Sequence, residues 1–123
     1  MRAVQVHVSY GEAADKISIL EIKSAKLTDP AKLANVAKEL ALLRTAFAPS
    51  DPGFAPLFEE LKKINEELWQ IEDDIRECEK RGDFGPEFIR LARAVYITND
   101  RRAKAKRGID DLLGSELKEE KSY

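Results

Sequence analysis

Residues 57–78, LFEELKKINEELWQIEDDIREC, place apolar side chains at alternating spacings of four and three. This spacing is the seam of a helix that packs lengthwise against other helices, because residues three and four apart share one helix face. Charged residues occupy most of the intervening positions and indicate a solvated opposite face. The apolar positions are Leu57, Leu61, Ile64, Leu68, Ile71, Ile75 and Cys78. The stretch therefore predicts an all-helical core.

Capping and breaking residues divide the rest of the chain into further helices. Ser9 precedes Glu12 at the spacing of a capping box, and Pro30 suits the first position of a helix. Gly82 is placed to end a helix in the left-handed conformation. We expect helices over residues 10–27, 30–48, 56–81 and 86–113, followed by a charged tail over 115–123. Short links predict two antiparallel hairpins.

The N-terminus shows a different period. Val4, Val6 and Val8 alternate with other residues, which predicts a short β-strand over residues 3–8. No second strand follows, so we expect this strand to pair with a second copy in a dimer or to lie over the helices. The fold predicted for the single domain 1–123 is all-α, an antiparallel four-helix bundle-like arrangement with this short N-terminal β-strand.

The two hairpins differ in predicted length. The last two helices exceed the first two by roughly eight residues, or about 12 Å at 1.5 Å per residue. The longer hairpin must therefore extend past the shorter one and leave part of its apolar seam exposed. Because such a seam needs cover, we predict a homodimer, with a protein partner as a further possibility.

Composition narrows the class of protein. Hydrophobic residues make up 43% of the 123 residues and charged residues 36%, with a formal net charge of −2. A single cysteine, Cys78, cannot form an intramolecular disulfide, which suits a reducing compartment. No apolar run approaches the roughly 20 residues of a membrane span. We expect a cytoplasmic protein without a membrane span.

The small net charge hides a local asymmetry. Residues 59–79 contain nine acidic and three basic side chains, whereas residues 90–107 contain seven basic and one acidic. The basic stretch has no aromatic residues between its last charges, and the acidic helix beside it would repel a polyanion. We therefore predict no nucleic-acid partner.

The helix expected over 86–113 interrupts its own apolar seam. Asn99, Arg102 and Lys106 occupy positions that the period directs inward, and such a conflict often marks a site. If the last two helices turn near residues 82–85, Asn99 lies level with Leu68 and Arg102 with Asn65. The candidate ligand-binding residues are Asn65, Trp69, Glu72, Arg90, Arg93, Tyr96, Asn99, Asp100 and Arg102.

These side chains allow two interpretations. In one, Arg90, Arg93 or Arg102 holds a phosphate or carboxylate, and aromatic side chains form flat walls of a pocket. In the other, Arg102 pairs with Glu72 in a buried structural network, an interpretation that the opposed charges of the two helices favour. An open mid-bundle pocket that reaches Asn99 and Arg102 would favour a small enzyme, and a filled core there would remove that alternative.

A pair of carboxylates on the first helix raises the question of a metal. Glu12 and Asp15 share a helix face, as a divalent-metal site in a bundle requires. Such pairs are common on solvated helix faces, and no second carboxylate pair lies nearby in the sequence. We predict no metal site and no cofactor, with Glu12 and Asp15 as the metal-ligand candidates of this first helix.

Several stretches together resemble an uncharacterised bacterial family, a domain of unknown function. They include SYGEAADKISILEIK at residues 9–23, LWQIEDDIR at 68–76 and YITNDRR at 96–102. The resemblance covers nearly the whole chain and implies a bacterial cytoplasmic protein without an assigned activity. It also implies an association with the biosynthesis of cell-surface polysaccharide.

Two functions follow as expectations. The preferred one is a non-catalytic binding or scaffold module that serves surface-polysaccharide assembly. It is preferred because the chain is dominated by packing residues and has no glycine-rich phosphate loop. The alternative is a small all-α enzyme acting on a phosphorylated or nucleotide-linked metabolite. In that case the arginines hold the anion, and Glu72, Asp73 or Asp100 serves as general base or metal ligand.

Overall fold

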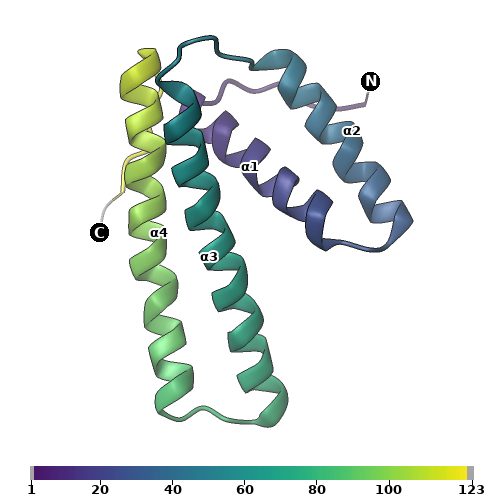
Figure 1. Ribbon diagram of the computed structural model, residues 1–123, viewed down its shortest axis with the longest axis vertical. Helices are drawn as coiled ribbons and strands as arrows, with labels where there is room; N and C mark the ends of the chain where they lie inside the picture. Colours follow the sequence, from purple (N-terminus) through teal and green to yellow (C-terminus); the bar gives the residue numbers. More distant parts are fainter. Residues whose placement is uncertain (1, 122–123) are drawn as a thin grey trace.

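The computed structural model describes residues 2–121, which form two helical hairpins (Figure 1). The shorter hairpin consists of α1 (Tyr10–Lys26) and α2 (Pro30–Ala46), and the longer one of α3 (Phe54–Arg81) and α4 (Pro86–Leu113). α1 packs against α2, α3 and α4, whereas the backbone of α2 lies close to α1 alone among the described helices. The predicted all-α fold with antiparallel helices is confirmed. None of the helices in the described chain combines the length and hydropathy that crossing a membrane requires.

The helix ends follow from local side chains. Ser9 Oγ accepts a hydrogen bond from the backbone N–H of Glu12 at 3.0 Å, and so satisfies a donor that α1 itself leaves free. Asp29 caps α2 in the same manner, with Pro30 at the first helical position. α3 ends at Gly82, whose φ of +64° is accessible to glycine without steric cost.

The predicted β-strand over residues 3–8 is wrong. This segment has no regular secondary structure, and Val4 and Val6 are 90% and 74% exposed. The structure describes no strand beside it, so its backbone groups have no ladder to join. The alternation of valines therefore indicates extended backbone at most.

The core consists of two clusters that both include α1. Ile17 and Leu20 of α1 pack with Val36 and Leu40 of α2 in one cluster. A second cluster joins α1 to the longer hairpin through Ala14, Leu61 and Ile109. Phe47, Phe54 and Phe58 are in ring contact with one another in succession and link the two clusters.

The longer hairpin continues well past α1 (Figure 1). α3 and α4 have 28 residues each, whereas α1 and α2 have 17. We refer to residues 73–97, around the turn between α3 and α4, as the distal arm. Its two helices pack on each other, and its outer faces expose apolar side chains, namely Phe84, Ile89, Tyr96 and Ile97.

Candidate functional site

α1 and α4 come into close contact at Gly11. A Cβ atom added to Gly11 would lie 2.3 Å from the backbone oxygen of Lys106, so only glycine allows the two helices to approach this closely. The Gly11 N–H donates to Asp110 Oδ1 at 2.7 Å. A carboxylate at the N-terminus of a helix is favoured by the free N–H groups and the helix dipole there. Asp110 thus anchors α4 to the first turn of α1.

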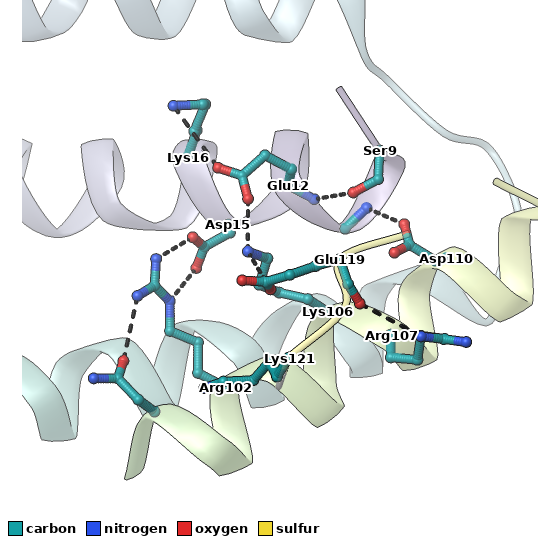
Figure 2. A network of polar contacts seen from close by, with 12 residues as sticks. Ser9, Glu12, Asp15, Lys16, Arg102, Lys106, Arg107, Asp110, Glu119 and Lys121 are labelled. Carbon is teal, nitrogen blue, oxygen red and sulfur yellow. Dashed lines mark hydrogen bonds and ion pairs between the residues drawn. The ribbon is translucent and has the colours of Figure 1, made fainter. Parts of the chain in front are cut away.

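One turn further along α1, Asp15 is the centre of a buried network (Figure 2). Its side chain is 1% exposed, and Arg102 of α4 binds it through both Nε, at 2.9 Å, and Nη2. Asn65 Nδ2 of α3 donates to Asp15 Oδ1 at 2.9 Å and to Ser18 Oγ at 2.8 Å. The Ser18 hydroxyl donates to the backbone oxygen of Asp15. The network therefore joins α1, α3 and α4 through one carboxylate.

A second ion-pair cluster lies between this network and Asp110. Lys106 Nζ of α4 lies 2.6 Å from Glu12 Oε2 and 3.0 Å from Glu119 Oε2, and its side chain is 7% exposed. Burial lowers the pKa of Lys106, but hydrogen bonds to the carboxylates of Glu12 and Glu119 more than offset this effect and raise its pKa above the ordinary value. The hydrogen bond to Asp15 likewise raises the pKa of Arg102, against the opposing effect of burial. Both cations are therefore held in the charged form.

An open cleft of about 430 Å³ adjoins the Asp15 network where α1 diverges from α3. Apolar side chains of α1 and α3 form part of its wall, and charged side chains of α3 line it as well. Asn99 and Arg102 reach it from α4. The complete lining is Ile19, Ile22, Asn65, Leu68, Trp69, Glu72, Asp73, Arg76, Asn99 and Arg102.

The structure brings five of the nine predicted ligand-binding residues to this cleft: Asn65, Trp69, Glu72, Asn99 and Arg102. The other four, Arg90, Arg93, Tyr96 and Asp100, are exposed and do not line it. At 3.6 residues per turn Arg90, Arg93 and Asp100 project from other sides of α4 than Asn99 and Arg102, whereas Tyr96 lies one turn nearer the start of the helix. Arg90 instead pairs with Glu87 one turn away, at 2.6 Å.

The predicted pairing of Arg102 with Glu72 is wrong. Asp15 takes that place because α1 crosses the hairpin at this level and inserts its carboxylate beside Arg102. Glu72 has only an exposed contact with Arg76, at 4.0 Å. The alignment of α3 with α4 alone places Glu72 near Arg102. The pairing with Asp15 depends on the position of α1, which that alignment does not include.

The expected solvated face of α1 is also wrong at Asp15, which is buried. Both metal-ligand candidates are engaged by cations: Asp15 by Arg102, and Glu12 by Lys106 and more distantly by Lys16, at 3.8 Å. Within residues 2–121 no group of three or more His, Cys, Asp or Glu side chains is arranged to hold a metal ion. The two carboxylates contact different partners and do not converge on one point.

Three important residues were not recognised from the sequence: Gly11, Asp110 and the buried role of Asp15. A usable signal was present, since Gly11, Ala14 and Ser18 are small residues at spacings of three and four. A stripe of small residues on one helix face permits a second helix to approach closely, and Asp15 lies beside that stripe. Reading the stripe would have predicted a helix crossing at this face.

Comparisons with known proteins give one result. A family model described as a family of unknown function, DUF6165, matches residues 4–123. No curated protein and no solved structure matches the chain significantly.

Proposed function

The chain belongs to this family of unknown function, and we propose that it is a non-catalytic binding or scaffold module whose ligand occupies the cleft between α1 and the α3–α4 hairpin. The observation that carries the proposal is the cleft itself, about 430 Å³ in volume, open to solvent and placed against a fully paired polar network. Sites for small ligands combine apolar walls with a few fixed polar groups. The cleft has both.

The walls and the charged residues have separate roles in this proposal. Leu68, Trp69 and Ile19 supply apolar surface, with the indole of Trp69 as its largest flat element. Glu72, Asp73 and Arg76 supply hydrogen-bonding groups of both signs on the neighbouring turns of α3. A ligand with an apolar face and several polar substituents would match this composition.

Arg102 orients such a ligand and has limited capacity to neutralise it. Its Nε and Nη2 atoms are occupied by Asp15, while Nη1 lies 3.4 Å from Asn99 Oδ1. Asp15 therefore already occupies the edge of the guanidinium that would otherwise bind a phosphate in bidentate fashion. The remaining Nη1 edge and Asn99 present a fixed polar corner to the cleft.

The alternative, a small enzyme acting on a phosphorylated or nucleotide-linked metabolite, draws support from a specific observation. The cleft is open and includes Asn99 and Arg102 together with Trp69 and Glu72. Arg90 and Arg93, which were expected to hold the anion, are away from it, so Arg76 would have to supply the free positive charge. We rank the binding module first because, besides Arg102, the cleft offers an anion only Arg76, which already has an exposed contact with Glu72.

The wider setting is also part of the proposal. The resemblance described above supports a bacterial cytoplasmic protein associated with cell-surface polysaccharide biosynthesis. The exposed apolar side chains of the distal arm, including Ile89 and Tyr96, support a homodimer or a protein partner at that surface. The cleft, which includes Asp73 and Arg76 at the base of the arm, and the exposed apolar surface of the arm would then be two contact surfaces of one scaffold.

Thermal unfolding with a panel of nucleotides, sugar nucleotides, acidic metabolites and divalent ions tests the cleft. A specific ligand at a hundredfold its dissociation constant adds about 2.7 kcal/mol to the free energy of unfolding. We expect the shift to disappear in Trp69→Ala and to persist in Phe84→Ala, an exposed aromatic residue outside the cleft. A shift that survives Trp69→Ala would place the ligand elsewhere, and catalytic turnover of the hit would favour the enzyme.

A further inference from the structure

The segment that follows α4 folds back along that helix. Beyond Gly114, residues 115–121 run beside α4 and form a strap over its basic side chains (Figure 2). The strap begins with a hydrogen bond from the Ser115 N–H to the backbone oxygen of Asp110, at 2.9 Å. Glu119 and Glu120 then reach two successive basic residues of α4. The acidic end of the chain therefore lies on the basic stretch that the sequence places in α4.

The contacts of Glu119 and Glu120 define a site. Glu119 Oε2 lies 3.0 Å from the buried Nζ of Lys106, and Glu120 Oε1 lies 3.2 Å from Arg107 Nη1. Arg107 Nη1 also donates to the backbone oxygen of Glu119 at 3.4 Å. Two neighbouring carboxylates and the carbonyl between their side chains are thus recognised together. This is the chemistry of peptide recognition and not of a single ion.

The folded body provides only part of what Lys106 requires. Glu12 of α1 is its permanent partner, at 2.6 Å, and the second carboxylate comes from the strap. Because a buried ammonium group is costly without anionic partners, the position held by Glu119 must be filled by a carboxylate or by water. Lys106 is therefore a preformed receptor for one additional acidic group.

The strap is held almost entirely by charge. The side chains of Glu119 and Glu120 are 47% and 78% exposed, and Leu117, the apolar residue of the strap, is half exposed. Exposed ion pairs contribute little individually and are screened by salt. No apolar core fastens residues 116–120, which are all exposed. The strap lysines add two further ion pairs to α4, Lys118 with Asp111 at 2.7 Å and Lys121 with Asp100 at 3.3 Å. A competing segment therefore has to displace ionic contacts and no packed core.

We propose that Lys106 and Arg107 form a docking site for an acidic peptide segment of another protein, and that residues 115–121 occupy this site as an intramolecular competitor. A groove of about 450 Å³ between the strap and α4 extends the site along Arg101 and Lys104. Charge complementarity is the argument for the partner, since the structure already contains an acidic segment seated there. The site stands on contacts different from those of the ligand cleft.

The surroundings favour a peptide over a nucleic acid. Glu12, Asp100 and Asp111 flank the basic side chains on neighbouring turns and would repel a continuous run of phosphates. An acidic peptide can place its two carboxylates between these groups, as Glu119 and Glu120 do. A polyanion cannot leave gaps of that kind.

The tether predicts how the competition behaves. A segment joined to the site by a short linker has an effective concentration in the millimolar range, so a free peptide competes poorly with it. Removing the strap carboxylates should expose the site without altering its basic residues. The variant Glu119→Gln with Glu120→Gln does this in the full chain. Glu116→Gln is the matched control, because no ion pair of Glu116 occurs in the described chain.

The test uses fluorescence anisotropy with a labelled peptide SELKEEK, the sequence of residues 115–121, and circular dichroism to verify folding. We expect the double variant to bind at least about tenfold more tightly than wild type or Glu116→Gln, as release of a tethered competitor requires. Arg107→Ala in the double-variant background should abolish the gain. Equal binding by wild type and the double variant, equal binding of the peptide SQLKQQK, which lacks the three carboxylates, or tighter binding of a single-stranded RNA would overturn the proposal.

Discussion

The crossing of α1 over α4 differs from the distal arm of the α3–α4 hairpin in what it buries and what it leaves exposed. At the crossing, three helices meet around Ala14 and Asp15, and charged side chains are buried because each finds a fixed partner. In the distal arm, two helices meet alone, and apolar side chains remain exposed because no third helix covers them. The crossing is therefore complete within one chain, whereas the arm has surface available for another molecule. The ligand cleft lies between these two regions.

The largest effect is expected when the guanidinium of Arg102 is removed from the crossing. Arg102→Met leaves the carboxylate of Asp15 buried and without its ionic partner, which should lower the free energy of unfolding by about 3 kcal/mol or more. Urea denaturation measures this change. Arg101→Met is the matched control on the same helix, because Arg101 has an exposed pair with Glu67 and its loss should cost less than about 1 kcal/mol.

Equal effects of the two arginine substitutions would contradict a structural role for the Asp15 network. The cleft would then be the main reason for the position of Arg102. A fold that is retained in Arg102→Met while ligand binding is lost has the same meaning.

The next effect concerns the close approach of the helices. Gly11→Ala places a methyl group against the backbone of Lys106, and the helices must separate to admit it. Overpacking of this kind typically costs about 1–3 kcal/mol. Differential scanning calorimetry should show a lower melting temperature for Gly11→Ala, whereas Gly108→Ala, with open space at its Cβ position, should be neutral or slightly stabilising. Equal melting temperatures for both variants would mean that α1 and α4 are farther apart.

The sequence predicts contacts within the α3–α4 hairpin better than contacts between the two hairpins. The periods and caps of α3 and α4 predict one hairpin, and its turn predicts that Asn65 and Arg102 lie near each other, which the cleft confirms. The crossing of the two hairpins is not predictable in the same way. Asp15 meets Asn65 and Arg102 across 50 and 87 residues of sequence, so no local period relates them. A charged residue beside small ones then looks like part of a solvated face.

A smaller effect concerns the pH dependence of the contribution that the buried Lys106 makes to stability. Its pKa in the folded chain is raised above the ordinary 10.5, so its contribution to stability is complete below that pH. The contribution is lost as pH rises through the folded pKa, because the unfolded chain releases the proton first. The difference in free energy of unfolding between wild type and Lys106→Met should therefore shrink in alkaline solution. A difference that grows above pH 10.5 would contradict this account.

The smallest effect on folding, and the most informative one about partners, concerns the distal arm. Ile89 and Tyr96 are 56% and 52% exposed, so Ile89→Ser with Tyr96→Ser should change the free energy of unfolding of the single chain by about 0.5 kcal/mol or less per site. Sedimentation equilibrium should show weaker self-association for the double variant if the arm is the dimer interface. A loss of several kcal/mol in dilute solution would show instead that these side chains pack within one chain.

Native-state hydrogen exchange tests the contrast between the two regions most directly. In dilute solution, the account predicts that amides near Leu61, Ile109 and the middle of α1 exchange only through global unfolding, because the paired network and both core clusters hold them. Amides of the distal arm, residues 73–97, should exchange through local opening at a distinctly lower free energy. Uniform protection along α3 and α4 would contradict the division of the molecule into a closed crossing and an open arm.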